Sequence, residues 1–499
     1  MNQFYPIKWV PILLLCLLTC ACPILQTSKP NLPRIYNGIT IPRPTGKNPI
    51  IVIPGVLGSR LVNSKTGEVA WPKFTGTTSD LLALPLTSPN VADNRDDLIA
   101  TEIIDRAKFF RLSPEISFYD SLLTALDQSG GYKRGSIDNP ASDGDHDTYY
   151  VFAYDWRRDN VESAQLLVRK IAKLKQTLNR PDLRFDILAH SMGGLIARYA
   201  AMYGEQDVLE TSDPKPDWAG ARHIARLIMF GTPNSGSMDA LSTMLNGYSV
   251  LGTNWPQLRL LDALDKEAAF TFPASYQLLP HPGYARFYDE KLNPLTLDIF
   301  APATWQQYGW SIAFEAEFKA REQTAVEKKR KKLKHKPTAE AETQLAEMEA
   351  ARERLLAARE PFLQAMLTRA AKLHRALDAG GVPPAHLRFY LFGGDCEPTL
   401  EAAIVGTIKG QMTTLFRVSR ALGKGEVRHR AAELMFAPGD SRVTRRSLFG
   451  LQVNGPSNSL TSVLPRPEQV TFHCEAHGDL PLNPTMQNNL LTVLMGNRF

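Results

Sequence analysis

The sequence predicts an α/β fold built on a mostly parallel central sheet. A strand over Tyr149 to Tyr154, an amphipathic helix over Ser163 to Leu178 and a further strand that begins at Phe185 follow one another directly. Such a strand, helix and strand unit implies that the two strands are parallel. Several apolar segments also end abruptly in turns that carry glycine, and in open α/β sheets ligands bind at this carboxyl edge. We therefore expect a functional site where these strands end.

Composition sets broad limits on the function. The chain has 499 residues, enough for one large α/β domain with insertions or for two or three ordinary domains. Hydrophobic residues make up 43% of it and charged residues 22%, which is typical of a globular protein. The formal net charge of +6 gives no argument for a nucleic-acid partner, and it fits an anionic lipid surface equally well.

The N-terminus predicts export. Lys8 precedes an apolar run from Trp9 to Leu18, which is short for a bilayer span and has the length of a signal-peptide core. We assign residues 1–22 to a signal peptide, with Cys20 and Cys22 as candidates for lipidation in a bacterial lipoprotein. Plain secretion is the alternative. The protein is therefore expected to be exported, either as a membrane-anchored lipoprotein or as a secreted or periplasmic protein.

A proline-rich tether and the first part of the core are expected to follow. Residues 23–49 suit an extended tether, and residues 50–236 form the first part of the α/β core. The strand Ile50 to Pro54 ends in a glycine turn, where the backbone N–H of Val56 is the best candidate to face a nucleophile. Residues 60–118 show no clean periodicity and are interpreted as a lid-like, loop-rich excursion, with ordinary core as the alternative.

The stretch from Phe185 to Leu195 contains the candidate nucleophile. Ser191 lies between a short apolar strand and a helix, as in the G-x-S-x-G elbow, and Ala189 and Gly193 are the small residues that such a tight turn needs. The helix that follows would point its N-terminus at negative charge near the serine. A chance Ser-Gly pattern is the alternative, and the flanking strand and helix patterns argue against it.

Two segments of different character follow. Residues 237–314 are mixed and aromatic-rich and are interpreted as a cap. Residues 315–378 lack glycine, and their composition predicts a charged insertion of two long helices broken near Pro337. The basic run from Lys328 to Lys336 is by default a solvated helix end. Contact with anionic lipid headgroups is the next interpretation, and nucleic-acid binding is least favoured because the signal peptide leads away from nucleic acid.

The remaining residues, 379–499, are expected to complete the core. Strands are predicted over Leu387 to Phe392, Glu433 to Phe436 and Val470 to Cys474, and a closing helix over Pro484 to Met495.

A serine nucleophile needs a general base, and the base needs a carboxylate to orient it. His477 is the candidate base because it lies in a turn after the last predicted strand, whereas His190 is expected to point away from Ser191. Two acids compete. Asp440 lies in a Gly-Asp turn, and Asp395 directly follows the predicted strand Leu387 to Phe392.

Cysteines are sparse. Only Cys396 and Cys474 lie in the body of the chain, where they could form a disulfide, although two buried free cysteines explain the count equally well. No metal-ligand cluster or nucleotide motif is recognised, so neither a metal nor a cofactor is expected.

Together these motifs resemble the lecithin:cholesterol acyltransferase and phospholipid:diacylglycerol acyltransferase family. The segments that carry the resemblance follow the family order: Pro54 to Gly58, Tyr154 to Arg157, Ala189 to Gly193, Gly231 to Pro233, Gly439-Asp440 and Ala476 to Gly478. They span the chain from about residue 50 to the C-terminus, apart from residues 315–378.

The resemblance implies an α/β-hydrolase fold with a lid and a cap. It also implies Ser191 as nucleophile, Asp440 rather than Asp395 as acid, His477 as base, and the backbone amides of Val56 and Met192 as the oxyanion hole.

Two features depart from the family pattern. Arg442 stands where the acid motif usually has threonine, which puts the local contacts of Asp440 in doubt. Cys396 falls after the glycines of its strand, so the disulfide of the family is not carried over.

The predicted function is that of a serine-dependent acyl-ester enzyme on lipids, either an O-acyltransferase or a phospholipase or lipase. Its expected partners are a glycerolipid or another acyl ester, a lipid alcohol where the acyl group is transferred, and a membrane surface. The alternatives are a secreted carboxylesterase for soluble esters and a non-catalytic lipoprotein scaffold that uses the helical insertion. The sequence decides neither between transfer and hydrolysis nor the oligomeric state.

Overall fold

The computed structural model describes most of the chain after the N-terminal segment. The described residues are 30–38, 47–73, 81–108, 115–249, 262–315, 339–454 and 459–495, with 320, 323–324, 326–328 and 330–331 in between. The predicted signal peptide, including Cys20 and Cys22, lies outside them, and so does part of the basic run Lys328 to Lys336. Among the described helices, none combines the length and the hydropathy that a bilayer crossing requires.

A seven-stranded sheet forms the centre of the molecule, in the order β22-β15-β10-β9-β1-β8-β7, and every neighbouring pair is parallel. This confirms the predicted parallel sheet. The strands are β1 (Ile50–Ile53), β7 (Lys133–Arg134), β8 (Thr148–Val151), β9 (Phe185–His190), β10 (Ile224–Phe230), β15 (Arg388–Gly394) and β22 (Gln469–His473). β1, β9 and β10 are central and apolar because helices cover both faces of the sheet.

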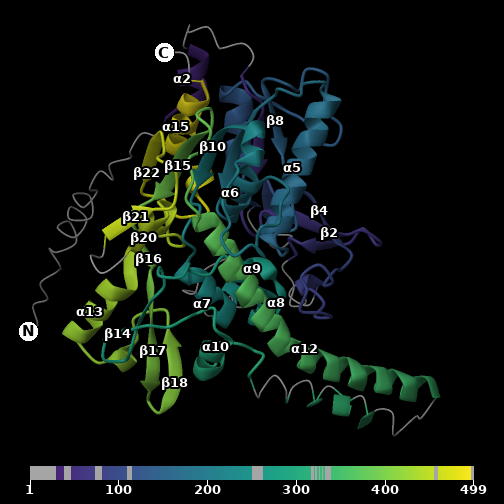
Figure 1. The fold of residues 1–499 in the computed structure, drawn as a ribbon, viewed down its shortest axis with the longest axis vertical. Coiled ribbons are helices and arrows are strands. Elements are labelled where there is room, and N and C mark those ends of the chain that lie inside the picture. Colours follow the sequence, from purple (N-terminus) through teal and green to yellow (C-terminus); the bar gives the residue numbers. More distant parts are fainter. Residues whose placement is uncertain are drawn as a thin grey trace, which may run out of the picture.

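Alternate residues of the central strands feed two cores, as the two-residue period of a strand requires. Ile51 and Ile53 of β1 pack with α5 (Asn160–Thr177) and α6 (Met192–Tyr203), whereas Ile50 and Val52 pack on the other face with α15 (Pro484–Met495). Figure 1 shows α5 and α15 on opposite sides of the sheet.

A second module with its own core forms the cap. It contains the four-stranded sheet β14-β13-β17-β18 and several helices. Its elements are α7 (Met238–Asn246), α10 (Pro302–Tyr308), α13 (Glu426–Met435), β13 (Arg286–Tyr288), β14 (Pro294–Leu295), β17 (Ala402–Ile408) and β18 (Gln411–Leu415). The prediction confined the cap to residues 237–314. It is larger, because β13 pairs in parallel with β17, far along the chain.

Only part of the predicted helical insertion, residues 315–378, stands apart from the body of the protein. α12 (Ala339–Asp378) is one helix of 40 residues, and its first half extends away from the body in Figure 1. After Pro361 one face of the helix is buried against both cores: Phe362, Leu363, Met366, Leu367, Ala370, Leu373, Ala376 and Leu377. The charged residues in this half, such as Arg369, occupy its other faces and mask the apolar stripe in the composition.

The segments interpreted as tether and lid are more ordered than expected. Within the predicted tether, α2 (Leu32–Gly38) packs beside α15, and the hydroxyl of Tyr36 donates a hydrogen bond to the Asn488 carbonyl at 2.9 Å. Within residues 60–118 lie the three-stranded antiparallel sheet β3-β2-β4 and the β5-β6 pair. Their bounds are β2 (Ser59–Asn63), β3 (Val69–Trp71), β4 (Leu98–Ile103), β5 (Arg106–Lys108) and β6 (Glu115–Ser117).

One predicted strand is wrong. Residues 433–435 belong to the helix α13, and the strand β19 (Phe436–Gly439) begins only after them. Ala431 and Met435 are both buried, and their four-residue spacing places them on one helix face. Further short elements are α4 (Asp120–Thr124), α8 (Lys266–Thr271), α9 (Pro273–Gln277), α14 (Arg445–Leu448), β11 (Tyr248–Ser249), β12 (Asp262–Leu264), β16 (Glu397–Leu400), β20 (Leu451–Asn454) and β21 (Ser459–Ser462).

Candidate active site

Ser191 occupies the sharp turn between β9 and α6. Its φ of 54° and ψ of −126° lie in a region that L-residues rarely adopt, and its N–H donates to the Phe230 carbonyl at 2.7 Å. The neighbours must be small. A Cβ on Gly193 would lie 2.6 Å from the Pro54 carbonyl oxygen, and one on Gly194 would lie 2.0 Å from Thr232 Oγ1. These contacts are the steric reason for the glycine pattern that identified the elbow.

Three side chains from distant parts of the sequence meet at this turn. His477 Nε2 lies 2.9 Å from Ser191 Oγ, and His477 Nδ1 lies 2.8 Å from Asp440 Oδ2. Because an ionised carboxylate only accepts, Nδ1 carries the proton and Nε2 can accept the proton of the serine. The structure therefore brings together all three side chains of the sequence-predicted set.

The loop geometry favours Asp440 over Asp395 as the partner of His477. β19 leads to Asp440 and pairs with β16, which follows β15 directly. Asp440 is almost fully buried, and its Oδ1 accepts backbone hydrogen bonds from Val443 at 2.7 Å and Arg442 at 3.0 Å. The described contacts include no hydrogen bond between Asp395 and His477.

Arg442, the departure from the family pattern, keeps the acid loop intact. Its backbone N–H is one of the two donors to Asp440 Oδ1, so this contact does not depend on the side chain. The guanidinium turns to α7, where Nη1 lies 2.6 Å from Asp239 Oδ2. The substitution thus ties the acid loop to the cap.

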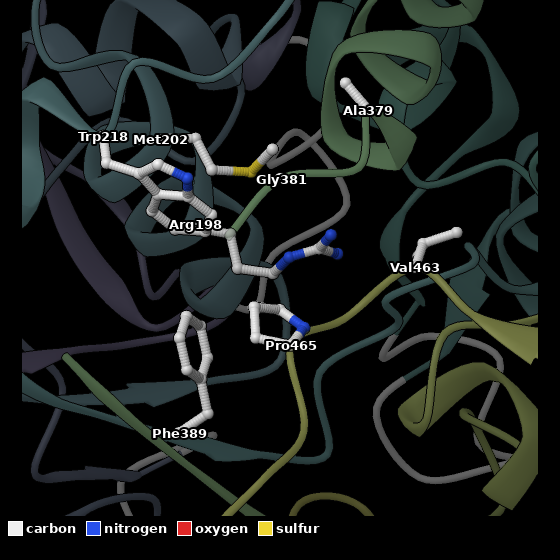
Figure 2. Close-up of a pocket in the computed structure, with 8 residues that line it drawn as sticks. All are labelled: Arg198, Met202, Trp218, Ala379, Gly381, Phe389, Val463 and Pro465. Carbon is white, nitrogen blue, oxygen red and sulfur yellow. The ribbon is translucent and has the colours of Figure 1, made fainter. Parts of the chain in front are cut away.

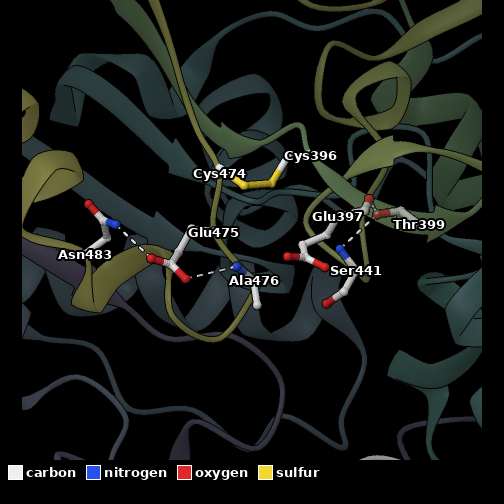
Figure 3. The surroundings of a disulfide bond; sticks show 8 residues. All are labelled: Cys396, Glu397, Thr399, Ser441, Cys474, Glu475, Ala476 and Asn483. Atoms are coloured by element: carbon white, nitrogen blue, oxygen red, sulfur yellow. Dashed lines mark hydrogen bonds between the residues drawn. A yellow bond between two sulfur atoms is a disulfide. The ribbon is translucent and has the colours of Figure 1, made fainter. Parts of the chain in front are cut away.

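A disulfide joins Cys396 and Cys474, which settles the pairing that the sequence left open and corrects the decision not to carry it over (Figure 3). The Cα atoms are 5.1 Å apart because β15 and β22 are neighbours and both cysteines come just after these strands. Thr399 Oγ1 also accepts from the Ser441 N–H at 2.8 Å. The disulfide and this hydrogen bond anchor the loops that present His477 and Asp440.

The two predicted oxyanion donors belong to segments that adjoin Ser191. Met192 is the first residue of α6, and the N–H groups of a first helical turn have no acceptor within the helix. Val56 lies in the turn after β1, where Gly55 packs so closely that an added Cβ would lie 2.8 Å from Ser191 Cβ. Among the described contacts, no acceptor is recorded for the Val56 N–H or the Met192 N–H.

Aromatic side chains hold the turn after β1 through its backbone. Tyr154 donates to the Pro54 carbonyl at 2.9 Å, Trp71 Nε1 to Leu57 at 2.7 Å and Trp156 Nε1 to Ser59 at 3.1 Å. All three aromatic side chains are buried. A backbone fixed in this way can present an amide without rearranging, as oxyanion stabilisation requires.

A cavity of about 360 Å³ opens above Ser191 and His477. Its walls come from the first excursion and the cap, and they are mainly apolar: Trp71, Phe118, Met244, Leu264, Phe272 and Leu278. Asp239 and Arg442 provide a charged pair in the wall. The size and lining suit the acyl chain of an ester with a polar group beside it.

Two residues that lie next to the site, His190 and Tyr119, were not assigned to it from the sequence. His190 was expected to point away from the serine, yet its ring lies 4.9 Å from that of His477, centre to centre. Tyr119, at the start of α4, contacts both Gly55 and His190. The adjacency of His190 to Ser191 was a usable signal, whereas nothing in the sequence around Tyr119 points to the site.

A smaller pocket lies away from Ser191, around the buried Arg198 of α6 (Figure 2). Its volume of about 10 Å³ is enough for roughly one water molecule. The Arg198 guanidinium donates to Asn234 Oδ1 at 2.9 Å and to the Leu377 carbonyl at 2.8 Å. Burial lowers the pKa of Arg198 to about 10. Arg198 thus connects α6, the loop after β10 and α12.

Among the described residues, one group could be mistaken for a metal site. It consists of Cys396, Glu397 and Cys474. Their ligand atoms lie close together, but the two sulfur atoms are bonded to each other and are not thiolates.

Comparison with known proteins agrees with the motifs. A family model described as lecithin:cholesterol acyltransferase matches residues 141–340, a range that includes Ser191 and ends before Asp440 and His477. The match confirms the resemblance stated from the motifs. A search of curated protein sequences finds no match.

Two solved structures are similar to this chain at 12% sequence identity. Tle4 in the Tle4–Tli4 complex has a TM-score of 0.46, and the alignment covers 90% of this chain and 98% of that chain. The mature form of the Bacillus licheniformis lipase BlEst2 has a TM-score of 0.31, with 92% of this chain and 95% of that chain covered. The central sheet, the serine elbow and the cap of this chain are arranged as an α/β-hydrolase fold, as predicted.

Proposed function

We propose that this protein is a serine-dependent acyl-ester enzyme that acts on lipids through an acyl-enzyme on Ser191. The observation that carries the proposal is the hydrogen-bonded series from Ser191 Oγ through His477 to Asp440, at 2.9 Å and 2.8 Å, on the floor of an apolar cavity. The match of residues 141–340 to lecithin:cholesterol acyltransferase supports the same chemistry.

The first half-reaction follows from the hydrogen bonds. Ser191 Oγ attacks the ester carbonyl as its proton passes to His477 Nε2, and the imidazolium is stabilised by Asp440. The Val56 and Met192 amides hold the oxygen that becomes negative, a contribution of roughly two to three powers of ten in rate for each donor in such sites. The proton then goes from His477 to the leaving alcohol, which departs and leaves the acyl group on Ser191.

The second half-reaction decides between hydrolysis and transfer. Water or a lipid alcohol gives its proton to His477 and attacks the acyl-enzyme, so the same side chains serve both outcomes. Walls such as Trp71 and Phe272 limit the water that reaches the ester, and a cavity of this lining accommodates a lipid alcohol. We therefore propose acyl transfer as an activity that accompanies hydrolysis.

A direct test compares phospholipid vesicles, with and without added sterol or diacylglycerol, against p-nitrophenyl butyrate, a short soluble ester. Preferred turnover of the vesicles, with label appearing in the added alcohol, is the expected result. Equal or better turnover of the soluble ester would contradict the lipid assignment in favour of a secreted carboxylesterase for soluble esters. Full cellular function in a Ser191→Ala strain would instead favour the scaffold interpretation.

We further propose that the protein is exported and acts at a membrane surface. The Cys396–Cys474 disulfide supports export, because such bonds persist in oxidising compartments. Labelling with radioactive palmitate, in Cys20→Ala and Cys22→Ala variants, tests the lipoprotein form. Loss of label in one variant would identify the lipidated cysteine, whereas an unlabelled wild-type protein would leave secretion as the route.

A further inference from the structure

A chain of hydrogen bonds runs beside the nucleophile, from the turn after β1 to the loop that carries His477. The Gly55 N–H donates to the hydroxyl oxygen of Tyr119 at 2.9 Å. The same oxygen lies 2.8 Å from His190 Nδ1, and His190 Nε2 lies 3.1 Å from the His477 carbonyl oxygen. His190 sits in the centre of this chain and shares its peptide bond with Ser191.

The bond directions follow from the acceptor at the end of the chain and from the charge of the ring. The His477 carbonyl can only accept, so His190 Nε2 carries a hydrogen. In the neutral imidazole Nδ1 is then an acceptor, and it takes the hydroxyl hydrogen of Tyr119, whose oxygen already accepts from the Gly55 N–H. A charged imidazolium would carry a hydrogen on Nδ1 as well, and the hydroxyl hydrogen of Tyr119 would have to turn away from it.

The surroundings favour this neutral form. Protein surrounds His190, although part of the ring faces the cavity, and burial together with the nearby His477 lowers its pKa to about 3. Burial also raises the pKa of Tyr119, so its hydroxyl keeps the hydrogen that the chain needs. The ring of Tyr119 meets that of His190 edge to face at 5.7 Å, which fixes its orientation.

We propose that Tyr119 and His190 are positioning residues. They hold the oxyanion turn and the catalytic base in fixed positions relative to each other. Tyr119 holds the amide of Gly55, and the next amide along the chain is that of Val56. His190 holds the backbone carbonyl of His477. The backbone N–H of His477 in turn donates to the Asp440 carbonyl at 2.7 Å. A displacement of either end is therefore transmitted to the other through Tyr119 and His190.

This inference rests on the proposed function, since it assigns roles around the same serine. It adds to that function a coupling between the oxyanion turn and the loop that carries the catalytic base. An error of about 1 Å in such an arrangement costs on the order of a hundredfold in rate. We therefore expect the loss to fall mainly on kcat. Tyr119 and His190 also line the cavity, so a KM that rises as much as kcat falls would indicate a substrate contact instead of a positioning role.

The test measures p-nitrophenyl butyrate hydrolysis and fluorophosphonate labelling of Ser191 in full-length variants. Tyr119→Phe removes only the hydroxyl and should lower kcat about tenfold or more, and His190→Ala about a hundredfold. His190→Gln keeps an acceptor and a donor in one amide and should recover most of the loss of His190→Ala. The double variant Tyr119→Phe/His190→Ala should be no slower than His190→Ala, since both break the same chain.

Tyr203→Phe is the matched control. Tyr203 is as buried as Tyr119, and its hydroxyl donates to the Ala376 carbonyl at 2.8 Å, outside the cavity lining. Equal kcat in Tyr119→Phe and Tyr203→Phe, or losses that multiply in the double variant, would overturn the coupling. A wild-type enzyme that neither turns over the ester nor labels at Ser191 would instead refute the proposed function.

Discussion

Asp440 and His477 are joined twice. The carboxylate Oδ2 of Asp440 lies 2.8 Å from His477 Nδ1, and its backbone carbonyl accepts the His477 N–H at 2.7 Å. The first contact sets the tautomer of the base, and the second fixes the loop that carries it. Because both contacts come from one residue, the acid and the base are positioned as a unit.

The first prediction concerns the choice of acid. Asp440→Asn should lower kcat by about three to four orders of magnitude, because an amide in place of the carboxylate no longer selects the tautomer with a free Nε2. Asp395→Asn is the control and should change kcat less than tenfold. Ester hydrolysis by the two purified variants gives the ranking, and the reverse order would assign the acid to Asp395.

The second prediction concerns the disulfide. Cys396→Ser/Cys474→Ser should lower the free energy of unfolding by about 2 to 4 kcal/mol, because the bond closes a long loop between residues 78 positions apart. Urea unfolding with and without a reductant measures this. The reductant should destabilise the wild-type protein and leave the double variant unchanged. A similar response of both proteins would mean that the bond contributes nothing to stability.

The third prediction concerns the packing of the elbow helix. Alanine in place of a helical glycine usually stabilises a helix by about 1 kcal/mol, yet a Cβ on Gly194 would lie 2.0 Å from Thr232 Oγ1. We expect Gly194→Ala to lower the melting temperature and kcat together. Gly380→Ala, where an added Cβ meets no atom within 4 Å, is the control and should change neither. A stabilised Gly194→Ala variant would contradict the observed contact.

The fourth prediction concerns pH and His190. Its pKa is lowered to about 3 in the folded protein, so between pH 6.5 and 3 the unfolded chain binds more protons there. The stability due to His190 is thus complete above pH 6.5 and is lost as the pH falls. Tyr119 and His477 are the titratable groups that face the ring.

Denaturant unfolding at pH 7 and pH 5 measures this contribution. The wild-type protein should lose about 1 kcal/mol more than His190→Gln over this interval, less than the full shift would give because part of the ring faces the cavity. If both proteins lost the same free energy of unfolding between pH 7 and pH 5, the pKa of His190 would not be lowered in the folded protein.

Local sequence patterns predicted the centre of the molecule well, because the information lies in short segments. The apolar strands β1, β8 and β9 and the closing helix α15 follow from the residues within each segment. The steric demand around Ser191 also shows in the sequence, because Gly193 has no room for a Cβ.

Features that depend on pairing between distant segments were harder to predict. Neither β13 nor β17 has a sequence pattern that indicates its partner strand. The predicted cap, residues 237–314, therefore leaves out β17. The apolar stripe of α12 after Pro361 is hidden among charged residues on its other faces. The cysteine pairing became decidable only when β15 and β22 were found to be neighbours. Tyr119 reaches the site through the fold alone.

The most direct test of the central claim is mass spectrometry of the purified protein after mixing with phospholipid that carries a labelled acyl chain. We predict that the wild-type protein gains the mass of one acyl group and that this group maps to Ser191. Ser191→Ala should show no such adduct. Any adduct that forms in His477→Ala should be long-lived, because the base that activates the acceptor is missing. Added sterol or diacylglycerol should shorten the lifetime of the wild-type adduct and take up the label. Acyl release that persists in Ser191→Ala, or an adduct on another residue, would contradict the account.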